Sequence, residues 1–547
     1  MRLSKNASRP DGCRRGNEER VNTVQKKKSG YWGWTWAIFF VVLAAEIAGA
    51  YILLYRKGYI LSDAMSRTAN AYYVLYIDPP KLASIGFVWN PLPSFLQIPI
   101  LLFKDVWPPL ATHGVAGGIV TAFFAACNAA LLFRTFKHYS VSTALSVILV
   151  LLFAFNPFMF YYGCNGMSEM PFFTTIIACV VGLCRWLDER DNHKLLVMMA
   201  FSLALGFLCR YEAFAITLGL GISLLIVVFG MKDPFSPFAP KPLRMKAEYA
   251  MATGLVLFLP VVYSVVVWII LNWSIMGDPF YFLTSSYSNT AQSEFILSAE
   301  IINAMSSPME ALLFSLGRML PFLPLFIVIT ISRMFSKRLF KPDYCVLVTI
   351  IGCISAFHFL MLLSGGSFGW PRFFSFSLPI CAAWLPYELS RLKGAVRHIS
   401  VAAVVVAFLV SASIVVSYFG SPVHAPEEYE AFVQTDVSGV VVQRAAAERI
   451  NEAYSDDVMM MDSFTMSTLI VNLDHPERLI ISTSDQFNDA LEAPWRYGVR
   501  YIVVADPSGV GSLDAFNMTY PSLYEEGADW CMEREEVGGF KIFEVLY

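Results

Sequence analysis

The sequence predicts an all-α polytopic membrane bundle that carries a small α/β domain at its C-terminal end. Of the 547 residues, 56% are hydrophobic and only 15% are charged, whereas soluble domains average about 45–50% apolar and about 25% charged residues. Apolar runs recur along the chain, and many reach the length of about 20 helical residues that crosses a bilayer. The last 127 residues differ, because they are acidic and alternate short apolar runs with helical patterns.

Residues 1–30 are expected to form a disordered cytoplasmic tail. They carry nine Lys and Arg residues, end in the run Lys26-Lys27-Lys28 and show no apolar periodicity. Segments of this composition bury too little apolar surface to offset the entropy of ordering.

About eleven transmembrane helices are expected between residues 31 and 420. The predicted spans are residues 31–55, 112–133, 141–158, 171–187, 194–209, 213–230, 249–272, 310–332, 344–363, 375–390 and 400–419. Residues 56–111 would form the first outer loop. Within it, residues 94–103 are apolar but too few to cross a bilayer, so an interfacial or re-entrant helix is expected there.

The distribution of Lys and Arg residues predicts the orientation of the bundle. With the N-terminus inside and the spans alternating, the inner loops hold 16 Lys and Arg residues and the outer segments hold seven. Because positive charge is enriched in cytoplasmic loops, a multi-pass protein of the plasma membrane with a cytoplasmic N-terminus is expected. Residues 421–547, with 23 acidic and 7 basic residues, would then be extracytoplasmic.

Residues 421–547 are predicted to form the small α/β domain. Strands are expected at Val458–Asp462, Arg478–Thr483 and Arg500–Asp506, with helical patterns between them. No Gly-rich phosphate loop is present in this region, so nothing indicates a nucleotide-binding module. A substrate-facing role and a stabilising role for the domain both remain open.

Ionisable residues in the predicted outer loops form a candidate site. The candidates are Asp63, Arg67, Asp78, Glu169, Arg210, Glu212 and Arg372. Sugar transfer from a phosphate-activated donor needs a carboxylate that deprotonates or orients the acceptor hydroxyl, and cations that hold the leaving phosphate. Asp63 is the preferred base. The seven His and ten Cys residues show no metal-ligand spacing, so no metal site is predicted and a divalent cation remains optional.

Several stretches resemble the GT-C superfamily of integral-membrane glycosyltransferases. These stretches are Asp63 followed by NPLP in the first outer loop, NPFMFYYGCNGMSEMPF, GFLCRYEAF, MGDPFYFL and GWPRFF. They are most similar to the branch of the protein O-mannosyltransferases and the bacterial lipid A aminoarabinose transferase. The resemblance implies an inverting transfer of a sugar from a polyprenyl-phosphate donor to a glycan, lipid or protein acceptor at the outer membrane face.

The resemblance also implies roles for individual residues. Asp63 would act as, or next to, the catalytic base, Glu169 would bind substrate or metal, and Arg372 would lie near the donor phosphate. Arg210 could serve similarly, and Arg67, Glu212 and Asp78 complete the predicted substrate-binding set. Many relatives have an Asp-Glu pair where this chain reads Asp63-Ala64, which leaves the second carboxylate to Glu169 or Asp78.

Simpler interpretations compete with these roles. Asp63 and Glu169 could each cap a helix, Arg210 and Glu212 could pair locally, and Arg372 could anchor the chain at the membrane interface beside two aromatic residues. For the whole chain, the alternatives are a lipid or sugar transporter or flippase, and a non-catalytic scaffold whose outer domain binds polymers. Membrane lipids are expected partners, and nucleic acid is not.

Overall fold

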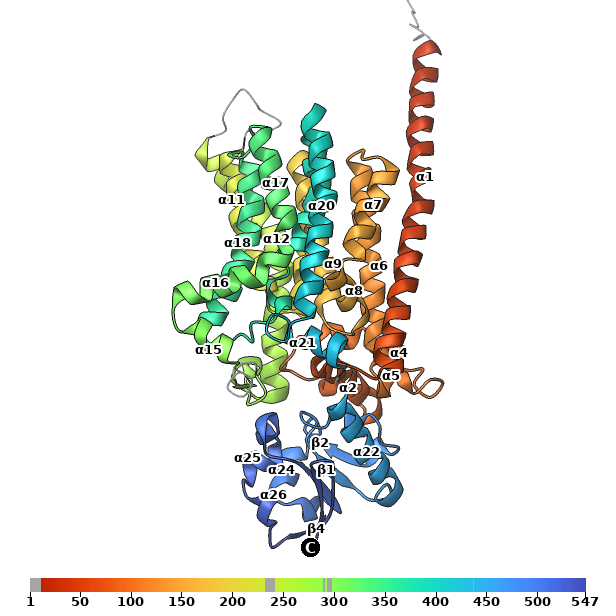
Figure 1. Cartoon of the computed structure of the whole chain (residues 1–547), viewed down its shortest axis with the longest axis vertical. Coiled ribbons are helices and arrows are strands. Elements are labelled where there is room, and N and C mark those ends of the chain that lie inside the picture. The colour runs from red at the N-terminus through yellow and green to blue at the C-terminus, as the bar shows by residue number, and fades with distance from the viewer. Residues whose placement is uncertain (1–10, 232–241, 289–290, 293–297, 436) are drawn as a thin grey trace, which may run out of the picture.

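The computed structural model shows a bundle of long helices with a small α/β domain packed against one end (Figure 1). The structure describes residues 11–231, 242–288, 291–292, 298–435 and 437–547, with side chains from residue 31 onward. We call the end of the bundle that contacts the C-terminal domain the domain-side end, and the opposite end the far end.

Seven helices among the described residues are long and apolar enough to cross a membrane, which makes this an integral membrane protein. They are α1 (Asp11–Ala50, continued by a π-helical segment at Tyr51–Arg56), α6 (Val115–His138), α9 (Glu169–Asp188), α11 (Ala213–Leu225, continued by Ile226–Gly230), α12 (Leu243–Met276), α18 (Pro342–Leu363) and α20 (Gly394–Phe419).

Two bent helix pairs raise the number of possible spans to nine. One pair joins α7 (Thr143–Ala154) to α8 (Pro157–Cys164) at 65°, and the other joins α16 (Pro308–Met319, continued by Leu320–Phe322) to α17 (Pro324–Phe335) at 84°. In both pairs the second helix begins with proline. Proline suits the first turn of a helix and interrupts a helix that precedes it, so the bends occur where the sequence requires them.

The predicted segments all become helical, but two are shorter than a membrane span. Helix α10 (His193–Cys209) has 17 residues and α19 (Ser377–Arg391) has 15, below the roughly 20 residues that cross a bilayer. Helix α19 is buried along almost its entire length. The all-α membrane bundle is therefore confirmed, with up to nine spans by length where about eleven were expected.

The N-terminal segment differs from the prediction of a disordered tail. Helix α1 begins at Asp11, so residues 11–30 continue the first span as helix. Once an apolar helix has formed, adding further turns costs little, and the Glu, Arg, Lys and Gln residues of this segment are good helix formers. Figure 1 shows α1 extending past the bundle at the far end. Residues 1–10 lie outside the described residues.

Short elements cover the domain-side end of the bundle. They are α2 (Ser62–Tyr76), α3 (Leu92–Phe95), α4 (Ile98–Leu101), α5 (Pro109–Thr112), α13 (Tyr281–Thr284), α15 (Ala299–Met305), α21 (Pro426–Tyr429) and 3₁₀ turns at Leu82–Ile85 and Pro371–Phe374. The predicted interfacial segment is thus a pair of one-turn helices, α3 and α4. Helix α2 buries Met65, Tyr72 and Tyr73 almost completely, which fixes it as a layer between the bundle and the C-terminal domain.

The C-terminal domain contains a five-stranded sheet with the strand order β2-β1-β3-β5-β4. Its elements are α22 (Ser438–Ala453), β1 (Met459–Met461), α23 (Ser467–Ile470), β2 (Leu479–Ile481), α24 (Phe487–Glu492), β3 (Tyr501–Ala505), α25 (Ala515–Thr519), α26 (Leu523–Glu526), β4 (Cys531–Val537) and β5 (Phe540–Val545). The parallel strands β1, β2 and β3 are the three that the sequence predicted. The antiparallel hairpin β4–β5, which extends the sheet beyond β3, was not predicted.

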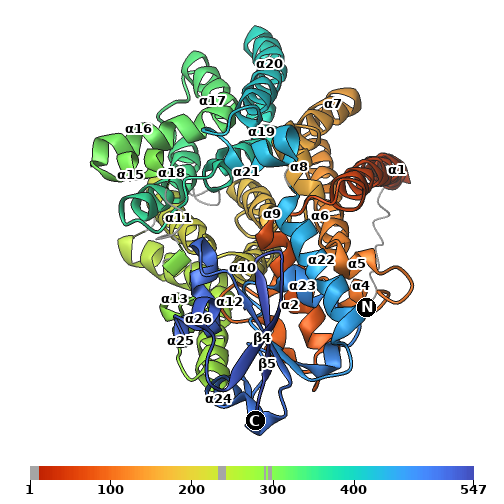
Figure 2. The ribbon, with the colours of Figure 1, turned by 60° about the horizontal axis from the view of Figure 1, so that its bottom comes forward.

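Polar contacts attach this domain to the domain-side end. The hydroxyl of Tyr287 donates to Asp462 at 3.0 Å, and the guanidinium of Arg444 donates to the backbone carbonyl of Thr112 at 3.1 Å. The side chain of Lys81 also pairs with Asp485. Figure 2 shows α22 and α23 close to α2 in this interface. Residues 56–111 and the C-terminal domain therefore pack against each other.

Candidate active site

Six of the seven predicted site residues come together at the domain-side end. They form a buried group of charges, which we call the site cluster: Asp63, Arg67, Glu169, Arg210, Glu212, Arg372 and, in addition, Glu427. These residues come from α2, the start of α9, the α10–α11 junction, the 3₁₀ turn before α19, and α21.

Asp63 reaches the cluster from the first turn of α2. The helix begins at Ser62, follows Leu61 as its N-cap residue and has no side-chain hydrogen bond at its cap. The carboxylate of Asp63 instead accepts a hydrogen bond from Arg372, with 3.0 Å between Nη2 and Oδ2. Asp63 therefore does not serve as the N-cap of α2.

Arg372 lies at the centre of the charge network. Its side chain is 3% exposed, and its guanidinium lies 3.2 Å from a carboxylate oxygen of Glu427 and 3.7 Å from one of Glu169, besides the contact to Asp63. The guanidinium also lies 4.4 Å from the ring centroid of Trp370, which is a cation–π distance. Arg372 thus contacts the aromatic ring of Trp370 and also three carboxylates.

Arg210, at the α10–α11 junction, contacts carboxylates at the start of α9 and at its own junction. Its Nη1 lies 2.5 Å from Glu169 Oε1, and its Nη2 lies 2.5 Å from Glu212 Oε1. The local pair with Glu212 exists, but the same guanidinium also holds Glu169. Ser168 does not cap α9 with its side chain; its hydroxyl accepts from Arg210 at 3.1 Å and from Arg67 at 3.2 Å.

Arg67 is a buried cation with unused hydrogen-bond donors. It lies one helical turn after Asp63 on α2 and is 6% exposed. One of its terminal nitrogens donates to Ser168, whereas Nε and Nη1 have no hydrogen-bond partner among the described residues. Its guanidinium also lies 5.5 Å from the ring of Trp89. Leaving a buried charged donor unpaired is costly, so this edge of Arg67 is suited to an anionic ligand.

Asp63 is the most accessible carboxylate of the site cluster. Its side chain is 26% exposed, compared with 2% for Glu169, 11% for Glu212 and 13% for Glu427. Burial by itself raises the pKa of Asp63, but the positive charges of Arg372 and Arg67 outweigh it and hold the pKa below its ordinary value. Asp63 is therefore ionised at neutral pH and open to solvent.

The structure does not bring Asp78 to the cluster. Asp78 follows the end of α2, and its side chain is exposed. Conversely, sequence reasoning missed two members of the site, Ser168 and Glu427. Glu427 begins an acidic pair directly after the last span, but this pair is only one part of a strongly acidic C-terminal region.

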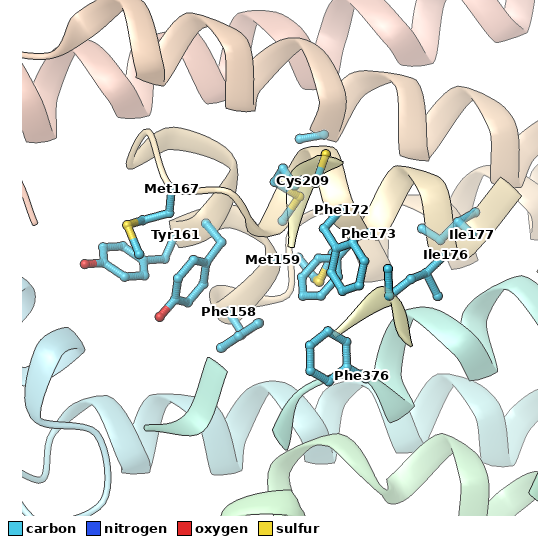
Figure 3. Close-up of a cluster of buried hydrophobic side chains, with 14 of the residues drawn as sticks. Phe158, Met159, Tyr161, Met167, Phe172, Phe173, Ile176, Ile177, Cys209 and Phe376 are labelled. Carbon is cyan, nitrogen blue, oxygen red and sulfur yellow. The ribbon is translucent and has the colours of Figure 1, made fainter. Parts of the chain in front are cut away.

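An apolar layer lies one helical turn inside the bundle from the charges. Figure 3 shows Phe172, Phe173 and Phe376 grouped there, and the ring of Phe376 lies 5.8 Å from Phe172 and 5.9 Å from Phe173, centroid to centroid. A small hollow lined by residues of α9, α10 and α11, including Phe172, Gly206 and Ala213, adjoins this layer. The charges thus lie over an apolar floor, which excludes water from below.

The carboxylates of the site cluster pair with guanidinium groups. Across the part of the chain that the structure describes, no three His, Cys, Asp or Glu side chains gather closely enough to hold a metal ion. Arg67, Arg210 and Arg372 instead supply three positive charges within one buried group.

Comparison with solved structures shows a distant likeness to a membrane enzyme. No protein-family model and no curated protein matches this chain. Its structure is similar to that of the archaeal oligosaccharyltransferase AglB from Archaeoglobus fulgidus, which was solved in complex with an inhibitory peptide and a dolichol-phosphate. The TM-score is 0.43 with 10% sequence identity, over 90% of this chain and 70% of that one.

Proposed function

We propose that this chain is an inverting glycosyltransferase that moves a sugar from a polyprenyl-phosphate donor to an acceptor hydroxyl at the membrane surface. One observation carries the proposal: an accessible, ionised carboxylate, Asp63, lies beside two buried guanidinium groups, those of Arg372 and Arg67. Arg67 keeps two donors unpaired. Sugar transfer from a phosphate needs a base for the acceptor hydroxyl and an adjacent site for the phosphate anion.

The reaction can be written with these groups. The acceptor hydroxyl donates a hydrogen bond to Asp63, and its oxygen forms a bond to the anomeric carbon from the side opposite the phosphate. The bond between this carbon and the phosphate oxygen breaks, and the electron pair leaves with the phosphate. The hydroxyl proton passes to Asp63, while Arg372 and Arg67 stabilise the charge that develops on the leaving group. Arg210 would keep Glu169 in place behind them.

The orientation in the membrane is part of the proposal. We place the site cluster and the C-terminal domain on the extracytoplasmic face because the Lys and Arg residues concentrate in the loops at the far end. Residues 31–420 would form the transmembrane catalytic part, and residues 421–547 would cover the acceptor side. A glycan, a lipid or a protein could supply the hydroxyl, and the donor's isoprenoid tail would lie along the membrane-facing helices.

A transporter or flippase is the second candidate, because two bent helix pairs are present. Broken helices that meet near a substrate site are typical of secondary transporters, and the bends here are 65° and 84°. A transporter would move a fluorescent polyprenyl-phosphate sugar across the bilayer of a vesicle without breaking it. A glycosyltransferase would consume the same molecule and leave a polyprenyl phosphate behind.

The deciding experiment incubates the purified full-length protein with a panel of polyprenyl-phosphate sugars, together with glycan, lipid and peptide acceptors that carry free hydroxyl groups, and measures donor consumption. Loss of a general base typically costs about 10²–10⁴-fold in rate, so we expect Asp63→Asn to lower turnover of an accepted donor by at least about 100-fold. Asp78→Asn is the matched control, because it removes an exposed carboxylate of the same loop. Turnover by Asp63→Asn within several-fold of wild type would refute the assignment.

A further inference from the structure

Glu427 makes an ion pair that lacks a proper hydrogen bond. Its Oε2 lies 3.2 Å from Arg372 Nε, but neither atom has a hydrogen-bond partner of acceptable geometry among the described residues. On another edge of the same guanidinium, Asp63 forms an aligned hydrogen bond at 3.0 Å. The edge of Arg372 that faces Asp63 thus makes an aligned hydrogen bond, and the edge that faces Glu427 does not.

The backbone around Glu427 is held by contacts that do not depend on its carboxylate. The hydroxyl of Tyr59 donates to the Glu427 carbonyl at 3.1 Å, and Tyr162 donates to the neighbouring Glu428 at 2.7 Å. Arg318 donates to the carbonyl of Val423 at 2.8 Å. The Glu427 side chain could therefore turn away from Arg372 while α21 stays in place.

The surroundings of Glu427 also disfavour a buried negative charge there. The nearby carboxylates of Glu428, Asp63 and Glu169 repel the Glu427 carboxylate, and Arg372 is the main cation that attracts it. Arg67 interacts electrostatically with Asp63, Glu169 and Arg372, and it retains two unpaired donors. Arg67 and Arg372 together therefore have hydrogen-bond donors that the Glu427 carboxylate does not pair with.

We propose that the donor's phosphate binds on the edge of Arg372 where the Glu427 carboxylate now lies, and that Glu427 sets donor affinity by competing for this position. The proposal deepens the proposed function and rests on it for the identity of the phosphate as that of a polyprenyl donor. A phosphate offers several oxygens, so it would align with Arg372 and also reach the unpaired donors of Arg67. The displaced carboxylate would turn toward solvent, to which it is already 13% exposed.

The competition predicts an effect opposite to that of a structural residue. Removing the negative charge at position 427 should strengthen phosphate binding, whereas loss of a merely structural contact would weaken it or leave it unchanged. We expect Glu427→Gln to bind a polyprenyl phosphate about tenfold more tightly than wild type, which corresponds to about 1.4 kcal/mol of binding free energy.

The test measures binding of decaprenyl phosphate, without any sugar, to the purified full-length protein in detergent by native mass spectrometry. Decaprenol is the matched lipid, since it has the same tail and no charge, and its affinity should not change. Glu428→Gln is the matched variant, because Glu428 is adjacent, buried and bonded to Tyr162 instead of to Arg372. It should bind decaprenyl phosphate as wild type does.

Each outcome bears on the proposal. Equal or weaker phosphate binding by Glu427→Gln would overturn it, and so would an equal gain in Glu428→Gln, because the effect would then be one of general charge. If neither wild type nor Glu427→Gln prefers decaprenyl phosphate over decaprenol, both this inference and the proposed function fail. If Glu427→Gln binds the phosphate more tightly but no polyprenyl-phosphate sugar is consumed, the proposed phosphate site is supported and the proposed transferase activity is refuted.

Discussion

Two buried clusters of arginine and carboxylate groups lie at opposite ends of this helical bundle. The far-end cluster, at the α17–α18 junction and the end of α19, consists of Arg333, Arg338, Asp343, Glu388 and Tyr387. Arg333 is fully buried, and its Nε donates to Glu388 at 2.7 Å, while its Nη1 and Nη2 donate to Asp343 at 3.1 and 3.0 Å. The two clusters contain similar residues, but they differ in how many of their side-chain atoms have hydrogen-bond partners.

The far-end cluster satisfies its own hydrogen-bonding capacity. Arg338 donates to Glu388 at 2.9 Å and to Asp343 at 3.3 Å, and Tyr387 donates to Asp343 at 3.2 Å. Among the described residues, none of its buried side-chain nitrogens or oxygens lacks a partner. Such a network ties three helices together and has no remaining donors for a ligand.

The site cluster leaves several of its atoms without partners. Among the described residues, atoms without a hydrogen-bond partner occur on Arg67, Glu169, Arg372 and Glu427, although the last two side chains form an ion pair with each other. Because an unsatisfied buried polar atom costs about 1–3 kcal/mol, a fold that tolerates several of them in one place is less stable than it could be. The comparison supports the proposal that the site cluster binds a ligand, and it predicts that the far-end cluster contributes to the stability of the bundle.

The largest expected effect separates the two clusters by stability. Arg333→Met would leave Asp343 and Glu388 buried with only Arg338 to neutralise them, and breaking a buried ion pair costs about 3–5 kcal/mol. We expect a large drop in the unfolding midpoint of the purified protein in detergent, measured by denaturant titration.

Arg67→Met is the matched substitution in the site cluster. It removes one hydrogen bond, to Ser168, together with two unpaired donors. The expected change in unfolding free energy is about 1 kcal/mol or less, while affinity for decaprenyl phosphate should fall at least about tenfold. If both variants lost the same stability and neither lost binding, the contrast between the clusters would be wrong.

The next effect tests how Arg372 controls Asp63. In the wild type the pKa of Asp63 lies below its ordinary value, so the base stays ionised and the rate should not fall through this group above about pH 4. Arg372→Gln removes the main cation, and burial then raises the pKa. The acidic limb of the pH–rate profile should move upward by about 1–3 pH units. If the acidic limb of the pH–rate profile of Arg372→Gln stayed where it is in wild type, Arg372 would not control the pKa of Asp63.

The membrane part of the fold could be predicted from sequence because its signals are local. Long apolar runs, prolines at the bends and charged loop residues each act within about 20 residues. The bounds of α10 and α19 were predicted within two residues, but both helices are shorter than a membrane span. The tail before residue 31 was read as disordered because its composition is polar, although α1 continues through residues 11–30.

Other features depend on contacts between distant residues. Strand β4 reads CMEREEV, and its side chains are mostly exposed, so its sequence lacks the short apolar run that marked β1 to β3. Asp63 and Arg372 were predicted from their loops, but their pairing spans 309 positions. Glu427 could not be distinguished from the other acidic residues around it, since only the fold brings it to Arg372.

Asp462 and Asp514 form a third buried acidic group, which differs from the two arginine-containing clusters because its hydrogen-bond donors are neutral. In the C-terminal domain Asp462 accepts from the backbone nitrogen of Ala515 at 2.8 Å, and Asp514 accepts from the hydroxyl of Thr465 at 2.6 Å and the backbone nitrogen of Phe516 at 3.0 Å. Burial raises the pKa of Asp514 to about 8, and the nearby Asp462 adds to the rise. Asp514 is therefore protonated in the folded domain at pH 7.

The smallest expected effect follows from this raised pKa. An unfolded Asp loses its proton near pH 4, so between about pH 4 and pH 8 the folded domain binds a proton that the unfolded domain does not. Folding stability must then fall as the pH rises through this window. Asp514→Asn removes the proton uptake and preserves the size of the side chain. We expect it to stabilise the domain at pH 8 by roughly 1–3 kcal/mol and to leave stability at pH 4 nearly unchanged.

Hydrogen exchange of the backbone amides in β1 and β3 measures this local stability in the intact protein. The exposed Asp529, changed to Asn, is the control and should leave the pH dependence as it is in wild type. A wild-type domain whose protection does not fall between pH 5 and pH 8 would show that Asp514 ionises as freely as the arginine-paired Asp63. In that case, guanidinium partners would not be what distinguishes the ionised carboxylates of the site cluster from the other buried acids of this chain.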